Sequence, residues 1–162
     1  MNRILSSVAL AFICLFPVYG QMAWNAKYQN YFNQYKDLAI EQMLKYRIPA
    51  SITLAQGVFE SGAGYSDLAR KGNNHFGIKC HGWQGRKTYH DDDERNECFR
   101  AYDSPGQSYE DHSKFLVQSQ RYRRLFSLKT TDYKGWAHGL KACGYATNPA
   151  YAKKLIDIIE LY

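Results

Sequence analysis

The feature that most constrains this chain is an apolar segment that runs directly into a glycine-rich turn. Residues 54–64 read LAQGVFESGAG. Apolar residues recur at helical spacing up to Phe59, and Gly62 and Gly64 predict that the helix ends there. Its last turn then carries Glu60, a carboxyl group that the apolar face can half bury and that still reaches a substrate. Such a group can stay partly protonated near neutral pH, as a general acid requires.

Residues 1–20 have the pattern of a secretory signal segment. Arg3 precedes an apolar run that ends in Val18-Tyr19-Gly20, residues that suit the positions read by a signal peptidase. We expect cleavage before Gln21, leaving residues 21–162 as one domain, since that length is within the usual range of about 100–200 residues. An uncleaved anchor is disfavoured because the apolar run falls far short of the about 20 residues that span a bilayer.

The mature chain is expected to be exported, whether periplasmic, cell-surface or secreted, with no stable membrane insertion. A lipid anchor on Cys14 is disfavoured because the bulky Phe12 and Ile13 precede it. Loss of Arg3 leaves 20 Lys and Arg against 15 Asp and Glu, a net charge of +5. This charge suits an anionic polymer such as cell wall. Nucleic acid is the disfavoured polymer because the basic residues are scattered along an exported chain.

Three cysteines remain after that cleavage, namely Cys80, Cys98 and Cys143. An oxidising compartment favours disulfides. Cys80 and Cys98 flank the same predicted hairpin, so we expect these two to pair. Cys143 is then left as a buried thiol.

A zinc site and a cysteine–histidine site are the chemical alternatives in this chain. The histidines of residues 75–90 and Cys80 fit no compact tetrahedral spacing, and a disulfide uses Cys80, so we expect no metal and no other cofactor. A thiol nucleophile would require Cys80 or Cys143 together with His112. Because Cys143 lies on an apolar helix face with no base beside it in sequence, we expect it to be inert.

Helical patterns precede and follow a short region of strand patterns. Helices are predicted up to residue 46, then over residues 49–60, 66–71, 108–119, 132–143 and 149–160. Ser66 is expected to cap the helix over residues 66–71, and Gly72 to terminate it. Strands are predicted over residues 76–80, 87–90 and 97–102. This order indicates an α+β fold that is mainly helical and has a small β-hairpin lobe.

Six short motifs occur in order along the chain, and the first of them contains Glu60. They are Glu60-Ser61-Gly62-Ala63-Gly64, Asn73-Asn74-His75-Phe76-Gly77-Ile78-Lys79, Trp83-Gln84-Gly85, Phe99-Arg100-Ala101-Tyr102-Asp103-Ser104, Asp111-His112 and Gly144-Tyr145-Ala146-Thr147-Asn148-Pro149-Ala150-Tyr151-Ala152. Their order and spacing resemble the glucosaminidase family of lysozyme-like peptidoglycan hydrolases, glycoside hydrolase family 73, which includes flagellar and autolysin glucosaminidases. The resemblance covers nearly all of residues 21–162.

The resemblance implies a lysozyme-like fold with the hairpin lobe beside an active-site cleft. It also implies an endo-β-N-acetylglucosaminidase that cleaves the β-1,4 bond between N-acetylglucosamine and N-acetylmuramic acid in peptidoglycan glycan strands. Residues 21–162 would then be the catalytic domain, acting as a monomer. Position alone leaves a solvated glutamate as the alternative for Glu60, whereas the resemblance implies that Glu60 is the general acid.

The second carboxylate lies in the acidic run before the Phe99 strand, according to the same resemblance. Asp92 is the preferred residue and Asp91 the next, with the rest of residues 91–94 open to a shift in alignment. Its role would be to activate water or to stabilise an oxocarbenium-like transition state. Inverting, retaining and substrate-assisted chemistry all remain open. The alternative for each residue is a solvated acidic turn.

The resemblance and the residue chemistry indicate further side chains at the cleft. Tyr145, in the Gly144–Ala152 motif, is expected to hydrogen-bond the acid or the substrate's acetamido group. The expected substrate-binding residues are Asn74, Phe76, Gly77, Trp83 and Tyr102. The first three would form the cleft floor, and the last two would stack on sugar rings, since aromatic faces suit apolar sugar surfaces. A structural turn and core packing are the respective alternatives.

Two other functions fit parts of the pattern. An N-acetylmuramidase of the same fold would use the same carboxyl group on the other glycosidic bond. A non-catalytic cell-wall-binding module would use the positive charge and the aromatic residues, but it would not need Glu60 at a helix end.

Overall fold

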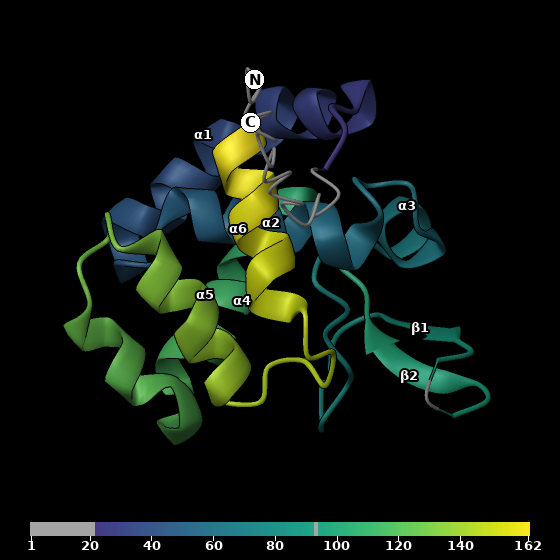
Figure 1. Ribbon diagram of the computed structural model, residues 1–162. Coiled ribbons are helices and arrows are strands. Elements are labelled where there is room, and N and C mark those ends of the chain that lie inside the picture. The colour runs from purple at the N-terminus through teal and green to yellow at the C-terminus, as the bar shows by residue number, and fades with distance from the viewer. Residues whose placement is uncertain (1–21, 93) are drawn as a thin grey trace, which may run out of the picture.

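The computed structural model describes residues 22–92 and 94–162, so the predicted signal segment and Asp93 lie outside the described residues. Helices make up most of this part, and a short β-hairpin stands to one side of them (Figure 1). The elements are α1 (Ala26–Tyr46), α2 (Ala50–Ser61), α3 (Asp67–Gly72), β1 (Lys87–His90), β2 (Glu97–Arg100), α4 (Pro105–Gln118), the 3₁₀ helix η1 (Gln120–Ser127), α5 (Tyr133–Ala142) and α6 (Tyr151–Leu161). The α+β prediction with a small hairpin lobe is confirmed.

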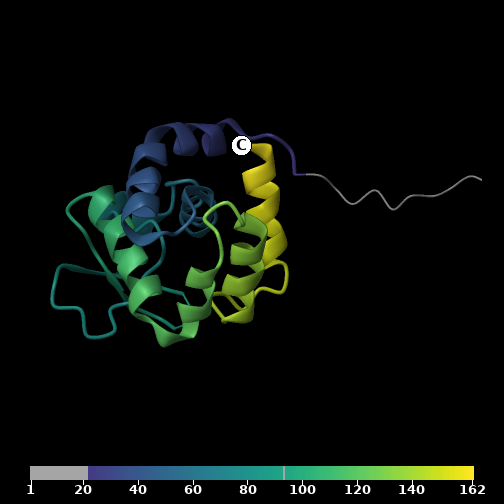
Figure 2. The same cartoon turned by 90° about the vertical axis from the view of Figure 1, so that its left-hand side faces the viewer.

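Helix α2 is the centre of the hydrophobic core. Every residue from Ile52 to Val58 is buried, because the helix is mostly apolar all round rather than on one face. Helices α1, α5 and α6 pack against it. The end of α6 lies beside the start of α1 (Figure 2), where the rings of Tyr162 and Tyr28 approach to 5.8 Å between centroids. The C-terminal end of α2 carries Glu60, and the packing of α1, α5 and α6 against α2 holds this helix in place.

The short helix α3 ends one residue later than the sequence predicts. Ser66 caps its start as expected, accepting a hydrogen bond from the Ala69 amide at 3.2 Å. Gly72 is still helical and is the last residue of α3. The residue that terminates the helix is Asn73, which adopts the left-handed conformation with φ of 49°. Gly72 packs closely instead, since a Cβ there would lie 3.3 Å from the Thr88 methyl carbon.

The hairpin of β1 and β2 is antiparallel, with Lys87 opposite Arg100 and His90 opposite Glu97. The first strand matches the prediction, and the second ends at Arg100 instead of Tyr102. The predicted strand over residues 76–80 is wrong: it makes a single bridge, between Lys79 and Phe99.

The side chain of Asn74 holds the chain in a turn before this bridge. Its amide donates to the carbonyls of Ile78 at 3.0 Å and Arg100 at 2.9 Å, and its oxygen accepts from the Ile78 amide at 3.1 Å. Strand-like pairing is limited to the bridge, where the Arg100 amide donates to the Ile78 carbonyl at 3.0 Å and the Cys80 amide donates to the Cys98 carbonyl at 2.9 Å. Gly77, at φ of 61°, turns the chain in a way that other residues rarely adopt.

The second half of the chain differs from the prediction mainly in its boundaries. Ser104 caps α4, which begins three residues before the predicted start, at Pro105. The 3₁₀ helix η1 was not predicted. Helix α6 begins at Tyr151 rather than Pro149, because the Asn148 side chain accepts from the Ala150 amide at 2.9 Å and holds a turn before the helix.

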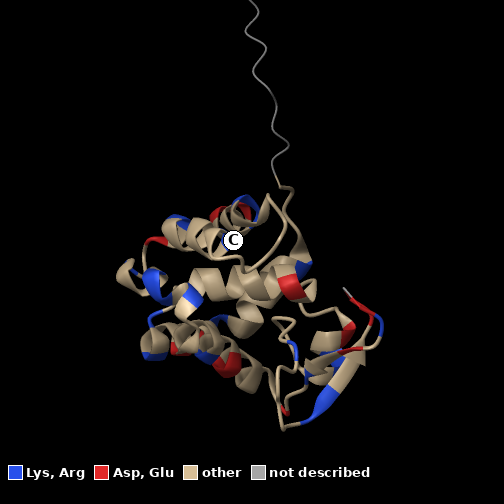
Figure 3. Cartoon of the chain, turned by 90° about the horizontal axis from the view of Figure 1, so that it is seen from below, with Lys and Arg blue, Asp and Glu red and all other residues tan. Residues whose placement is uncertain are grey.

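Charged residues of both signs are interspersed over the helices and the hairpin (Figure 3). No helix in residues 22–92 and 94–162 combines the length and apolar character needed to cross a membrane.

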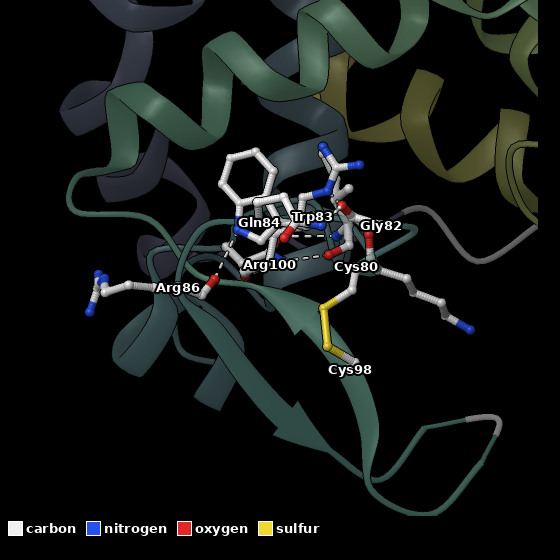
Figure 4. Close-up of a disulfide and its surroundings, with 10 residues drawn as sticks. Cys80, Gly82, Trp83, Gln84, Arg86, Cys98 and Arg100 are labelled. Atoms are coloured by element: carbon white, nitrogen blue, oxygen red, sulfur yellow. Dashed lines mark hydrogen bonds between the residues drawn. A yellow bond between two sulfur atoms is a disulfide. The ribbon is translucent and has the colours of Figure 1, made fainter.

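The predicted disulfide joins Cys80 to Cys98, with 5.5 Å between the two Cα atoms. It ties the turn after residue 79 to β2, and the Cys80 amide adds a 2.9 Å hydrogen bond to the Cys98 carbonyl (Figure 4). Cys143 is a free thiol at the end of α5, half buried rather than fully buried.

A buried network of aromatic side chains joins α1 to the elements around the end of α2. The Tyr109 hydroxyl donates to the Tyr31 hydroxyl at 2.9 Å, and Tyr31 lies 2.9 Å from Nδ1 of His75. Tyr31 also lies against Gly57 of α2, where a Cβ would meet its hydroxyl oxygen at 2.3 Å. Glycine at this position therefore allows α1 to approach the Glu60 helix closely.

The substitution Gly57→Ala tests this close approach. In most helix interiors alanine is about 1 kcal/mol more favourable than glycine, but here the new methyl group would clash with Tyr31. We expect a net loss of about 1–3 kcal/mol of stability, measured by thermal unfolding. Gly106→Ala is the matched control, because its Cβ would meet Leu38 at an ordinary 3.6 Å. A melting temperature that Gly57→Ala leaves unchanged would contradict the tight packing.

Candidate active site

A cleft of about 410 Å³ opens between the helical body and the hairpin lobe. Its walls come from the end of α2, the start of α3, the segment before the hairpin, the hairpin itself, α4, η1 and the turn after α5. The lining residues are Glu60, Ser66, Leu68, Phe76, Gly77, Ile78, Lys79, His81, His90, Asp92, Phe99, Phe115, Arg121, Tyr122, Gly144 and Tyr145.

Glu60 lies in this cleft on the last turn of α2, half buried. The pKa of its carboxyl group is raised to about 7: burial is the main cause, a hydrogen bond from Tyr151 opposes part of the rise, and the negative charge of Asp92 adds to it. A carboxyl group with a pKa near 7 is partly protonated at neutral pH and can donate its proton to a leaving group.

The turn after Glu60 is held by its own polar groups. The Ser61 hydroxyl donates to the Gly57 carbonyl and accepts from the Gly64 amide at 2.7 Å. Gly62 follows in the left-handed conformation, with φ of 56°, and its amide donates to the Val58 carbonyl. The Ser-Gly-Ala-Gly motif therefore ends α2 immediately beyond Glu60 and leaves the carboxyl group facing the cleft.

Tyr151 makes the hydrogen bond to Glu60, and sequence reasoning did not single it out. Its hydroxyl donates to Oε1 of Glu60 at 3.0 Å and accepts from the Gln56 side-chain amide, also at 3.0 Å. Gln56 lies one helical turn before Glu60, so α2 supplies both ends of this chain of bonds. The available signal was the position of Tyr151 within the Gly144–Ala152 motif.

Tyr145 lies beside this pair, lining the cleft. Its ring stacks on that of Tyr151 with 5.7 Å between centroids and 21° between planes. Burial and the charge of Glu60 raise the pKa of Tyr145, so its hydroxyl stays protonated. The expected hydrogen bond to the acid is thus made by Tyr151, while Tyr145 packs against that tyrosine and faces the cleft.

Asp92 and Asp91 have different positions, although they are neighbours. Asp92 lines the cleft, and its Oδ2 lies 3.9 Å from Nζ of Lys79. Asp91 instead accepts a 2.7 Å hydrogen bond from the Asn96 amide inside the hairpin turn. Of these two residues, Asp92 alone affects the Glu60 carboxyl group, raising its pKa. Asp93, the third residue of the run, is outside the described residues.

The predicted substrate-binding residues divide into two groups. Phe76 and Gly77 line the cleft, as expected of floor residues. Asn74 is buried and shapes the turn beneath them. Trp83 and Tyr102 do not line the cleft and pack against each other edge to face at 5.8 Å.

An ion pair explains the positions of Trp83 and Tyr102. Arg100 pairs with Asp111 of α4 at 2.8 Å, and the Tyr102 hydroxyl donates to the same carboxylate at 2.6 Å. The Arg100 guanidinium lies 5.0 Å from the centre of the Trp83 ring. Both aromatic side chains therefore join the lobe to α4, the packing alternative raised by the sequence.

Residues of the alternative metal and thiol sites occupy other environments in the structure. Across residues 22–92 and 94–162, no three His, Cys, Asp or Glu side chains are grouped to hold a metal ion. His112 is fully buried and stacks on Phe76 at 4.0 Å, and burial lowers its pKa to about 3. Cys80 is in the disulfide.

This arrangement, a mainly helical body with a small antiparallel hairpin beside a cleft that contains a buried carboxyl group, is the lysozyme-like fold. Solved structures agree: the chain is 31% identical to a peptidoglycan hydrolase from Sphingomonas sp. A1, with a TM-score of 0.70 over 81% of this chain and 86% of that one. The glycoside hydrolase domain of FlgJ from Salmonella typhimurium gives 27% identity and a TM-score of 0.68, covering 82% of this chain and 86% of that domain.

The chain belongs to the glucosaminidase family, described as mannosyl-glycoprotein endo-beta-N-acetylglucosaminidase, whose sequence model matches residues 36–162. It is 35% identical to the exo-glucosaminidase LytG of Bacillus subtilis, covering 73% of this chain and 45% of LytG. Identity to the peptidoglycan hydrolase FlgJ of Vibrio parahaemolyticus is 29%, covering 80% of this chain and 46% of FlgJ. The chain therefore spans less than half the length of these two relatives.

The Tyr151 hydrogen bond leads to a prediction for pH dependence. A general acid acts in its protonated form, so if Glu60 has this role we expect activity to be lost as pH rises through its pKa of about 7. The bond lowers that pKa, so Tyr151→Phe should raise it and move the alkaline limb of the pH–rate profile to higher pH. We also expect kcat to fall about 5- to 10-fold, because the carboxyl group loses a partner that orients it.

The control for Tyr151→Phe is Tyr133→Phe. Tyr133 also donates to a glutamate, Glu160, at 3.0 Å, but at an exposed position away from the cleft. Its profile should match that of the unmodified protein. An alkaline limb that stays in place or moves to lower pH in Tyr151→Phe would contradict the assigned bond.

Proposed function

We propose that this chain is an exported peptidoglycan hydrolase that cleaves the β-1,4 bond between N-acetylglucosamine and N-acetylmuramic acid. The observation that carries the proposal is Glu60, a half-buried carboxyl group with a pKa of about 7 that lines a cleft. Family membership and the relatives named as peptidoglycan hydrolases support the substrate class.

Glu60 acts as the general acid in this proposal. Tyr151 donates to Oε1, so the carboxyl proton is carried on Oε2. Transfer of that proton to the glycosidic oxygen neutralises the leaving sugar as the bond from this oxygen to the anomeric carbon breaks. Water then supplies hydroxide to the anomeric carbon, and its remaining proton restores the carboxyl group or passes to a second base.

Asp92 is the proposed second carboxylate. It lines the same cleft on the hairpin side, and its negative charge raises the pKa of Glu60. A carboxylate in that place stabilises the positive charge that develops on the sugar ring, or accepts a proton from the attacking water. Tyr145, which also lines the cleft, is proposed to contact the acetamido group of the substrate.

The proposal extends to the chain's processing and state. Removal of residues 1–20 would leave residues 21–162 as an exported, monomeric catalytic domain that needs no cofactor. The predicted enzyme is endo-acting and cleaves within glycan strands. An enzyme that acts like the exo-glucosaminidase LytG would instead cleave at strand ends.

Digestion of purified peptidoglycan tests the role of Glu60. The unmodified protein should create reducing ends on N-acetylglucosamine, identified by mass spectrometry after borohydride reduction. Glu60→Gln should lower the rate at least about 100-fold, since it keeps the shape and the Tyr151 bond but has no proton to donate. Glu41→Gln, on the exposed face of α1, should leave the rate unchanged.

The products of the same digestion separate the alternatives. An early fall in glycan-strand length indicates internal cleavage, and release of small fragments alone indicates terminal cleavage. Reducing ends on N-acetylmuramic acid would identify a muramidase of the same fold. Cleavage of the peptides instead of the glycan strands would contradict the proposed function. So would a protein that binds the wall but cleaves nothing, if Glu60→Gln binds equally well.

Single substitutions in the hairpin test the second carboxylate. Asp92→Asn should reduce kcat about 10- to 100-fold, because a charge near the developing oxocarbenium ion is lost. It should also move the alkaline limb to lower pH, since the Asp92 charge raises the Glu60 pKa. Asp91→Asn, which removes a carboxylate outside the cleft, should change kcat less than about twofold. A larger effect in Asp91→Asn than in Asp92→Asn would contradict the assignment.

A further inference from the structure

The cleft wall opposite the hairpin is formed in part by a basic segment. From His112 to Thr131 the chain contains three Arg, two Lys and no acidic residue. The three arginines lie on η1, at positions 121, 123 and 124. Both signs of charge are mixed over the surface as a whole (Figure 3), so the overall charge does not by itself direct an anionic ligand to the cleft.

Arg121 is the arginine of η1 that lines the cleft. It donates to the Gly144 carbonyl at 3.4 Å. Burial raises the pKa of the Tyr122 hydroxyl, and the nearby Arg121 guanidinium opposes part of that rise. Within residues 22–92 and 94–162, its guanidinium makes no ion pair with an acidic side chain at 4.0 Å or less. In the described part of the chain, no neighbouring carboxylate therefore neutralises its charge.

The other cation of the cleft has partners. Nζ of Lys79, on the hairpin side, lies 2.9 Å from Glu97 and 3.9 Å from Asp92. A carboxylate ligand would have to compete with these two groups for Lys79. At Arg121 the same ligand would meet no acidic competitor among the described residues, and a guanidinium binds a carboxylate through two parallel hydrogen bonds.

We propose that Arg121 binds a carboxylate carried by the muramyl sugar of the substrate and so makes the enzyme prefer peptidoglycan to uncharged polymers of N-acetylglucosamine. The inference rests on the proposed function. Both polymers share β-1,4-linked N-acetylated sugars, and carboxylates on alternate sugars distinguish peptidoglycan. The carboxylate belongs either to the lactyl group, when it is unsubstituted, or to the peptide attached to it.

The test compares Arg121→Gln with the unmodified protein on three substrates of defined charge. The first is soluble glycan strands with their peptides, and the second is the same strands after an amidase has removed the peptides and freed the lactyl carboxylates. The third is the peptide-free strands with these carboxylates converted to neutral methylamides. Arg123→Gln, an exposed arginine of η1 that does not line the cleft, is the matched control.

We expect Arg121→Gln to raise KM about 10- to 100-fold on at least one carboxylate-bearing substrate and less than about threefold on the neutral strands, with kcat nearly unchanged. A loss confined to peptide-bearing strands assigns the carboxylate to the peptide, and a loss confined to peptide-free strands assigns it to the lactyl group. Arg121→Lys should recover part of the loss, because it keeps the charge without the paired hydrogen bonds. Arg123→Gln should match the unmodified protein on all three.

Two results would overturn the inference while the proposed function stands. One is an unchanged KM in Arg121→Gln on every substrate that the unmodified protein cleaves. The other is an equal rise in KM on charged and neutral strands, which would assign Arg121 to the shape of the cleft. If the unmodified protein creates no reducing ends on any strand, the proposed function fails, and the inference fails with it.

Discussion

The burial of α2 is the constraint on which the candidate site depends. An apolar helix enclosed by α1, α5 and α6 carries Glu60 at its end, and this surrounding protein raises the pKa of the carboxyl group to about 7. The helix also supplies Gln56, which holds the Tyr151 hydroxyl against Glu60. The same packing of α2 therefore both forms the core and raises the pKa of the Glu60 carboxyl group.

The opposite wall of the cleft depends on polar contacts rather than on a large core. The Asn74 side chain bonds the carbonyls of Ile78 and Arg100, the Cys80–Cys98 disulfide ties the turn to β2, and Arg100 pairs with Asp111 of α4. A two-stranded hairpin is marginal by itself in water, so these links are what hold the lobe against the helical body. They place Asp92 within electrostatic range of Glu60.

Local rules predicted much of this structure correctly. Helix periodicity and caps located the helices, the hairpin was expected where β1 and β2 lie, and the motif order indicated the family that residues 36–162 match. The errors have local causes. Residues 76–80 have strand-like composition, but the Asn74 side chain holds a turn at their start and only the bridge at Lys79 pairs with β2. Trp83 and Tyr102, which are predicted to stack on sugar rings, pack around the Arg100–Asp111 pair.

The sequence by itself determined that a carboxylate ends an apolar helix, that a glycine-rich turn follows it, and that two cysteines belong to the hairpin region. These properties follow from neighbours in the chain, whose spacing fixes periodicity, caps and turns. Only the tertiary structure decided that Tyr151 holds Glu60, that Asp92 lines the cleft while Asp91 bonds within the hairpin turn, and that Arg121 lines the cleft. Glu60 and Tyr151 are 91 positions apart, and no local pattern states which distant side chains meet when the helices pack.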